Sequence, residues 1–173
     1  LPPGTNAELI ATASFSIEGI PFVFTNSAMG CLVDVDVDTG LTKIEKFWAV
    51  EDCGTQINPK LVEEQIRGGV VQGIGGALYE ECIYDEMGNL TNGNMADYLV
   101  PMAYEMPDII VDHVTTNSGR SILGAKGAGE AGTGGAPGAI MNAINDALIP
   151  FNVEVTSQPI TPEKILKLLG KIQ

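Results

Sequence analysis

The alternation of apolar and polar positions in the first third of the chain has a period of two, which predicts paired β-strands. Residues 31–38 alternate apolar and acidic side chains over eight positions, as expected of a strand with one buried and one solvated face. Asp38-Thr39-Gly40 predicts a hairpin turn into a returning strand at 41–50. Residues 11–24 predict an earlier strand, a turn at Glu18-Gly19 and the start of another strand. The expected packing residues of the returning strand are Ile44, Phe47 and Trp48.

A long helix is predicted after the second strand of this hairpin. Asn58 is suited to cap it and Pro59 to occupy its first position, so the helix runs from about Lys60 to about Tyr79. Its apolar stripe consists of Leu61, Val62, Ile66, Val70, Ile74 and Leu78. Each glycine inside a helix costs about 1 kcal/mol relative to alanine, so several of them indicate that backbone approaches another helix, a sheet or a ligand closely. These glycines are Gly68, Gly69, Gly73, Gly75 and Gly76.

The second half of the chain predicts a mixture of short strands and two helices. A loop at 124–135 that is rich in glycine leads into the first of these helices, which Pro150 ends. The fold class expected for the single domain is therefore α+β, a mostly antiparallel sheet with a long glycine-rich helix and a second helix after the loop. The predicted elements are strands at 82–84, 109–116 and 151–155 and helices at 136–148 and 163–169.

Charge and cysteine content exclude several classes of protein. The net charge is -13 and no cluster of Lys and Arg is present, which argues against a nucleic-acid binder or a protein of anionic membrane surfaces. The three cysteines are widely spaced, so we expect no metal site held by this chain alone and a reducing, cytoplasmic compartment. No run of the roughly 18 apolar residues needed to span a bilayer occurs.

The loop at 124–135 is the part of the chain that most clearly indicates chemistry. Its small residues leave backbone N–H groups uncovered just before a helix, which is compatible with a cradle for an anion or a polar ligand. A glycine-rich loop is weak evidence by itself, and a flexible surface loop is the simpler interpretation of this composition alone. It departs from phosphate-binding motifs, because Lys126 is not followed by Ser or Thr. A carboxylate packed away from water can act as a base near neutral pH, and Glu130 is the only one in this loop.

Four stretches, in order, carry a resemblance to a known family. Residues 50–59 read VEDCGTQINP, and residues 62–75 read VEEQIRGGVVQGIG, followed by ALYE at 77–80. Residues 124–133 read GAKGAGEAGT, followed by NAINDA at 142–147, and residues 157–165 read SQPITPEKI. Together they resemble the molybdenum-binding subunit of the xanthine dehydrogenase, aldehyde oxidase and aerobic carbon monoxide dehydrogenase family. The resemblance implies that residues 1–173 are the C-terminal portion of the molybdopterin-binding domain.

The same resemblance implies roles for individual residues. Glu130 matches the active-site base of a hydroxylase that oxidises an aldehyde or an N-heterocycle, or of an enzyme that oxidises CO, with oxygen taken from water. Gln65 matches the residue that hydrogen-bonds the pterin, whereas Cys53 is given no metal role. Backbone contacts beside the metal are implied for Lys126, Gly127, Ala128 and Gly129.

The resemblance also implies a cofactor and partner chains. The cofactor is a molybdopterin-type molybdenum cofactor, often the cytosine dinucleotide form in bacterial relatives, and 2Fe-2S clusters and FAD are expected on partner chains. The family subunit is several times longer than this chain, so the remaining half of the molybdenum subunit is expected as a partner beside an iron–sulfur subunit and a flavin subunit. The loop reads Glu-Ala-Gly-Thr where purine-type members place prolines, which favours a carbon-monoxide-dehydrogenase-like or aldehyde-type member. Two alternatives stay open, a non-catalytic interaction subunit of such a complex and a stand-alone glycine-rich ligand-binding module.

Overall fold

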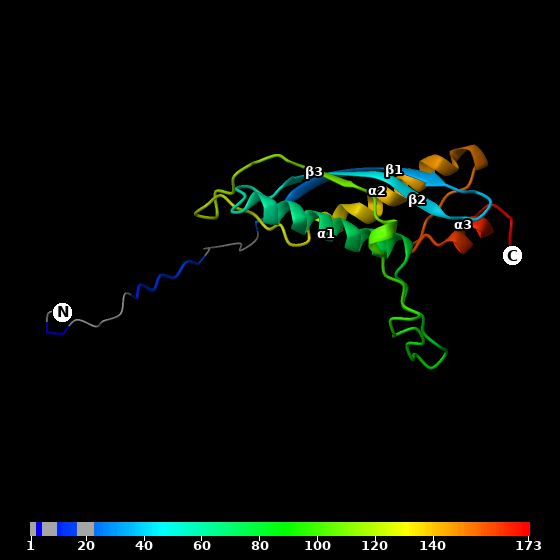
Figure 1. The fold of residues 1–173 in the computed structure, drawn as a ribbon, viewed down its shortest axis with the longest axis horizontal. Helices are drawn as coiled ribbons and strands as arrows, with labels where there is room; N and C mark the ends of the chain where they lie inside the picture. The colour runs from blue at the N-terminus through cyan, green and yellow to red at the C-terminus, as the bar shows by residue number, and fades with distance from the viewer. Residues whose placement is uncertain (1–2, 5–9, 17–22) are drawn as a thin grey trace.

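The computed structural model describes residues 3–4, 10–16 and 23–173. In this part of the chain a three-stranded sheet, of order β1-β2-β3, packs against two long helices (Figure 1). No helix in the described ranges is both long and apolar enough to cross a bilayer. The elements are β1 (Asn26–Val35), β2 (Thr42–Asp52), α1 (Pro59–Leu78), η1 (Ala103–Glu105), β3 (Ile109–His113), α2 (Ala131–Leu148), η2 (Ile149–Phe151) and α3 (Pro162–Leu168).

The predicted hairpin is confirmed, because β1 and β2 pair antiparallel and a tight turn joins them. Asp36 Oδ1 accepts a hydrogen bond from the Asp38 backbone N–H at 2.8 Å, which holds the turn. Gly40 has φ +76°, and a side chain there would also collide with the Pro162 backbone. Glycine therefore allows both the turn and the contact with α3.

An irregularity in the β1–β2 pairing decides which side chains of β2 face the core. Lys46 pairs with Leu32 and Ile44 with Val33, so Glu45 is an extra residue in β2. Ile44 and Phe47 consequently both point inward and are buried, as predicted. The prediction for Trp48 was wrong, because this residue lies on the outer face of the sheet and is 39% exposed.

The sheet is mixed, so the prediction of a mostly antiparallel sheet holds only for the β1–β2 pair. β3 pairs parallel with β2, from Phe47 opposite Ile109 to Glu51 opposite His113. Helix α1 carries the chain back along the sheet before β3 begins, and such a crossover places the next strand parallel to the last. The strand predicted at 109–116 is thus present in a shorter form.

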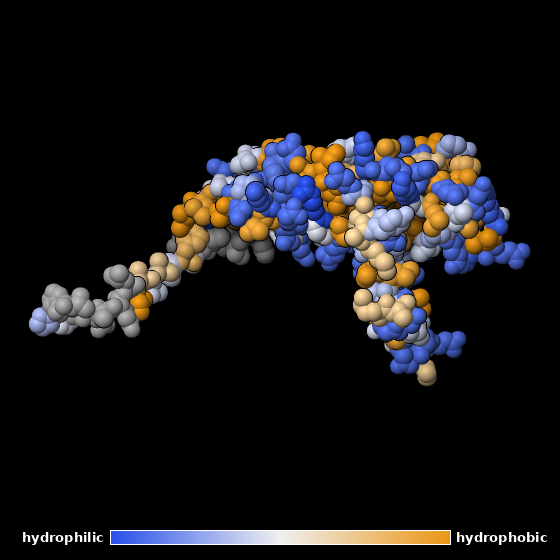
Figure 2. Space-filling view, viewed as in Figure 1, coloured by the Kyte–Doolittle hydropathy of each residue, from blue (hydrophilic) through white to orange (hydrophobic). Residues whose placement is uncertain are grey.

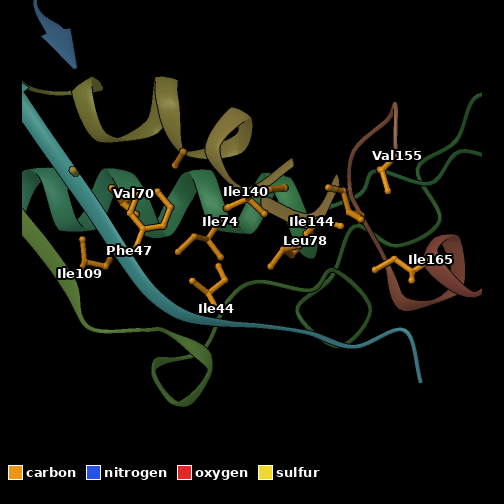
Figure 3. Close-up of a cluster of buried hydrophobic side chains, with 14 of the residues drawn as sticks. Ile44, Phe47, Val70, Ile74, Leu78, Ile109, Ile140, Ile144, Val155 and Ile165 are labelled. Carbon is orange, nitrogen blue, oxygen red and sulfur yellow. The ribbon is translucent and has the colours of Figure 1, made fainter. Parts of the chain in front are cut away.

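The core lies between the sheet and the two helices (Figure 3). Phe47 from β2 is fully buried, and Leu61 at the start of the predicted stripe of α1 is instead 67% exposed. Complete burial of an apolar side chain such as that of Phe47 contributes about 1.5–3 kcal/mol to folding. The fully buried members from the helices are Ile66, Val70, Ile74, Ala77, Ala136, Ile140, Ile144, Leu148 and Ile165.

Helices α1 and α2 approach each other through small residues. A Cβ on Gly69 would lie 3.1 Å from Gly132 Cα, and one on Gly73 would lie 2.7 Å from Ala136 Cβ. Gly68, in contrast, borders open space. The contact explains why α2 begins at Ala131, five residues before the predicted start at 136, because packing against α1 outweighs the weak helix propensity of glycine.

Three other predicted strands are absent. Residues 11–16 form no strand, and the predicted turn at Glu18-Gly19 lies outside the described residues. The 82–84 segment makes only an isolated bridge, from Tyr84 to Leu90. The 151–155 segment forms no strand, because η2 (Ile149–Phe151) extends to its first residue and the Asn145 side chain binds both the N–H and the C=O of Val155. The Asn145 side chain thus binds the backbone groups of Val155 that a neighbouring strand would bind in a sheet.

Candidate active site

The loop that precedes α2 is fastened along the end of β2. Gly54 and Ala125 form an isolated antiparallel bridge, and the Lys126 N–H donates to the Cys53 carbonyl oxygen at 2.7 Å. Gly124 has φ +73° at the turn into this stretch. The first part of the loop is therefore ordered by backbone pairing with residues that follow β2.

A nearly buried ion pair anchors the same loop. Lys126 Nζ lies 2.9 Å from Asp52 Oδ2 and 2.6 Å from Thr116 Oγ1, and the two charged side chains are only 9% and 11% exposed. Asp52 also accepts from the N–H groups of Gly54 and Thr116. Hydrogen bonds from Thr116 and then Lys126 hold the pKa of Asp52 well below its ordinary value.

This anchor changes how Lys126 can act, and it was not foreseen from the sequence. Both its backbone N–H and its ammonium are used inside the chain, so a cofactor contact from Lys126 would come from its carbonyl oxygen. Asp52 and Thr116 were missed because their partner lies 74 and 10 residues away in sequence. The only local signal was an acidic residue at a strand end, next to the Cys53-Gly54 turn.

Beyond Lys126 the loop presents bare backbone. Within the described ranges, the N–H groups of Gly127, Ala128 and Gly129 have no hydrogen-bond acceptor. A Cβ on Gly127 or Gly129 would meet nothing within 4 Å, so open space lies above these residues. Free amides at the start of a helix such as α2 suit an anionic or polar group.

Gln65 and Gly129, both predicted site residues, are brought together. Gln65 lies in the second turn of α1, and its Nε2 donates to the Gly129 carbonyl oxygen at 2.7 Å. Thr133 Oγ1 reinforces the arrangement by donating to the Gly69 carbonyl oxygen at 3.1 Å. The Oε1 of Gln65 remains an acceptor beside the free amides of the loop.

Glu130 occupies the N-cap position of α2. Its carbonyl oxygen accepts from the N–H of Thr133 at 3.1 Å, but its carboxylate caps no backbone N–H of the helix. The side chain is exposed, so the described part of the chain does not provide the predicted shelter from water.

A second carboxylate near the loop was missed by sequence reasoning. Glu51, next to Asp52 in β2, is 1% exposed, and neither of its carboxylate oxygens has a hydrogen-bond partner in the part of the chain that the structure describes. Burial raises the pKa of Glu51 to about 7. His113 pairs with Glu51 across the sheet, and its Nδ1 is likewise buried and without a partner. The strict alternation of β2 near its end could have placed Glu51 inward.

Known proteins share this arrangement of sequence and fold. The family model described as "Molybdopterin cofactor-binding domain" matches residues 4–107. The nicotine 6-hydroxylase large subunit of Paenarthrobacter nicotinovorans is 46% identical over 84% of this chain and 18% of its own length. The carbon monoxide dehydrogenase large chain of Afipia carboxidovorans is 35% identical over 91% of this chain and 19% of its own.

A solved structure agrees with these relatives. Quinoline 2-oxidoreductase from Pseudomonas putida 86 superposes with a TM-score of 0.82, at 44% identity, over 85% of this chain and 19% of its own chain. The chain thus spans less than a fifth of the length of the relatives that it matches. It belongs to the molybdopterin cofactor-binding family of the xanthine dehydrogenase, aldehyde oxidase and carbon monoxide dehydrogenase large subunits.

Proposed function

We propose that this chain forms one wall of the cofactor site in a molybdenum-dependent hydroxylase, with Glu130 as the base. The observation that carries the proposal is the hydrogen bond from Gln65 Nε2 to the Gly129 carbonyl oxygen. This bond joins Gln65 to the loop at 126–129, and the family resemblance implied cofactor contacts for both. Gly129, which accepts the bond, directly precedes Glu130. On this view residues 1–173 are the C-terminal portion of the molybdopterin-binding domain.

The residues present fit a pterin-type group. Gln65 Oε1 can accept a hydrogen bond, and the uncommitted N–H groups of Gly127, Ala128 and Gly129 can donate, so a ligand edge with mixed donors and acceptors would be satisfied. Lys126 would add its carbonyl oxygen. When bound, the molybdenum cofactor would supply the two-electron redox chemistry, whereas this wall would hold and orient it.

Glu130 would take up a proton from water-derived oxygen in the reaction. Its carboxylate makes no hydrogen bond to a described residue, so it is free to accept that proton. A general base must lie within hydrogen-bond reach of the proton that it takes up, and the open space beside Gly129 leaves room for the reacting group there. The exposure of Glu130 in this chain would be removed by the rest of the large subunit, which would exclude water from the reacting groups.

An N-heterocycle is the substrate class that we favour. The relatives at 46% and 44% identity are named for hydroxylation of nicotine and oxidation of quinoline, both of which are N-heterocycles. Aldehydes and CO are the other substrates in the family, and the carbon monoxide dehydrogenase large chain is 35% identical. The nitrogen of such a ring makes the adjacent carbon electron-poor, which suits attack by an oxygen that has lost its proton to Glu130.

The assembly that we propose has further members. The cofactor would be the cytosine dinucleotide form, and 2Fe-2S clusters and FAD on an iron–sulfur subunit and a flavin subunit would carry the electrons away. The rest of the molybdenum subunit would complete the substrate pocket. One relative is named as a subunit of a dehydrogenase complex, which supports a multi-subunit enzyme.

Replacement of Glu130 in the assembled enzyme tests the role of the base. Glu130→Gln should keep the molybdenum content and lower turnover at least about 100-fold, since general-base catalysis contributes that much or more. Glu154→Gln, which changes another exposed carboxylate, is the matched control and should leave turnover unchanged. Full turnover by Glu130→Gln with normal molybdenum would instead support the non-catalytic interaction subunit. Loss of molybdenum in Glu130→Gln would show a structural role.

A further inference from the structure

Residues 80–100 form an arm that projects from the body of the molecule, whereas Pro101 lies against Gly75 of α1 and η1 lies beside the start of β2. Figure 1 shows this green segment extending away from the sheet and from α1, after which the chain returns to β3. The arm contains no helix or strand apart from the isolated Tyr84–Leu90 bridge. A segment of this kind gains little stability from the core of the chain that carries it.

Side-chain hydrogen bonds nevertheless give the arm a defined shape. Asn92 is 7% exposed, and its side chain accepts from the Ile83 N–H at 2.9 Å and donates to the Glu81 carbonyl oxygen at 2.6 Å. At its base, the Tyr98 hydroxyl donates to Glu80 Oε2 at 2.7 Å. The arm is therefore pre-organised rather than an open loop.

This ordered arm exposes an unusual amount of apolar surface. Met87 is 83% exposed, Met95 82% and Tyr84 61%. Figure 2 shows apolar side chains along much of the arm, with hydrophilic ones gathered at its far end. The other exposed apolar residues of the arm are Ile83, Leu90, Leu99 and Val100. Clustered apolar surface on an ordered segment marks an interaction site.

The charge of the arm restricts the partner. Residues 80–100 include five acidic side chains and no Lys or Arg, namely Glu80, Glu81, Asp85, Glu86 and Asp97. A complementary surface must therefore be apolar with basic side chains around it. A second copy of this chain is a poor partner, because each copy has a net charge of -13 and like charges oppose association.

We propose that the arm docks on the remaining portion of the large subunit, on an apolar surface with a basic rim. The family model includes residues 4–107 and therefore the whole arm, yet the chain spans only 18–19% of the length of its relatives. Most of the subunit that such an arm could contact thus lies outside these residues. The proposal rests on membership of the family and does not depend on the role of Glu130.

Photo-cross-linking in the assembled enzyme tests the partner. We would replace Met87 or Met95 by p-benzoylphenylalanine and identify the cross-linked peptides by mass spectrometry, with Ile149 as a control because it is 67% exposed outside the arm. Cross-links from both arm positions to the remaining portion of the large subunit, absent from Ile149, are expected. Cross-links to a second copy of this sequence or to an iron–sulfur or flavin chain, or no specific cross-link, would overturn the proposal.

Charge placed on the arm provides an independent test. Met95→Asp and Leu99→Asp should each lower the yield of assembled enzyme about tenfold, as expected for central interface residues, whereas Ile149→Asp should not. The thermal unfolding of each variant chain separates an assembly defect from a folding defect, because both arm side chains are exposed here. Assembly at the normal yield by both arm variants would contradict the proposed docking.

Discussion

Lys126 Nζ lies 2.9 Å from Asp52 Oδ2 and ties the loop that ends at Glu130 to the end of β2. Both side chains are almost completely removed from solvent, at 9% and 11% exposure. The pair thus fixes one end of the loop, and the hydrogen bond between Gln65 and Gly129 fixes the other. Between these two points the backbone N–H groups are not covered by side chains, and a cradle for a polar group requires such accessible N–H groups.

The first prediction concerns this ion pair. Asp52→Asn should destabilise the chain clearly, because it leaves the Lys126 ammonium nearly buried and without its opposite charge. Glu45→Gln is the control, since Glu45 pairs with Lys43 at the exposed surface and surface pairs contribute little. Urea unfolding at pH 7 measures both, and equal changes in the two variants would contradict the account.

The same variant should also show a characteristic pH dependence. The pKa of Asp52 is lowered in the folded chain, so the stability it contributes is present above its ordinary value near 3.8 and is lost as pH falls through the lower folded value. The difference in stability between the native chain and Asp52→Asn should therefore be full at pH 6 and shrink below about pH 4. A difference that is constant across this range would argue against the charge as its cause.

Glu51 should behave in the opposite way. Burial raises the pKa of Glu51 from 4.5 to about 7, so the native chain loses stability as pH rises from the unfolded value to the folded value. Glu51→Gln removes that penalty and should be more stable than the native chain by about 1–3 kcal/mol at pH 8, with little difference at pH 4. Unfolding curves at both pH values test this, and a destabilised variant at pH 8 would reveal a partner for the carboxylate.

How much of this could be predicted from the sequence depends on the range of the interaction. The Asp38-Thr39-Gly40 turn and the Asn58 cap of α1 are set by neighbouring residues, and both were predicted correctly. The parallel pairing of β3 depends on how the whole chain folds, so no local pattern indicated it. The period of two in β2 places Glu51 on the same face as Phe47, but only the folded chain shows how completely that face is buried.

The features of the candidate site likewise separate into those that neighbouring residues determine and those that depend on the whole fold. The loop around Glu130 was recognisable from its composition and its resemblance to a family, whereas the hydrogen bonds that hold it connect residues 64 or 74 positions apart. The early start of α2 has the same origin, because its first glycines become helical against α1. Sequence patterns therefore indicated which residues carry chemistry, and tertiary contacts determined how they are held.

The close contact between α1 and α2 gives a sharp packing test. Gly132→Ala should destabilise the chain by about 1–3 kcal/mol, because its Cβ would collide with the Ile66 carbonyl oxygen and lie 2.8 Å from the Val70 nitrogen. Gly138→Ala in the same helix meets nothing within 4 Å and should instead stabilise by about 0.5–1 kcal/mol. Calorimetric unfolding measures both, and stabilisation by both substitutions would mean that the helices are farther apart.

Loss of the Gln65 side chain should affect cofactor content. Gln65→Ala removes the hydrogen bond to Gly129 and the amide offered to the pterin, so the assembled enzyme should retain several-fold less molybdenum. Gln72→Ala, two turns farther along α1, is the control and should retain normal molybdenum. Metal analysis of both purified variants decides the matter, and equal molybdenum contents would remove Gln65 from the proposed site.

The rate at which substrate reduces the assembled enzyme, followed by stopped-flow absorbance under anaerobic conditions, tests the role of Glu130 most directly. At matched molybdenum content, Glu130→Gln should reduce this rate at least about 100-fold, because the proton has no acceptor. An unchanged rate would mean that the carboxylate at the start of α2 is not the base, however well the surrounding loop fits the cofactor.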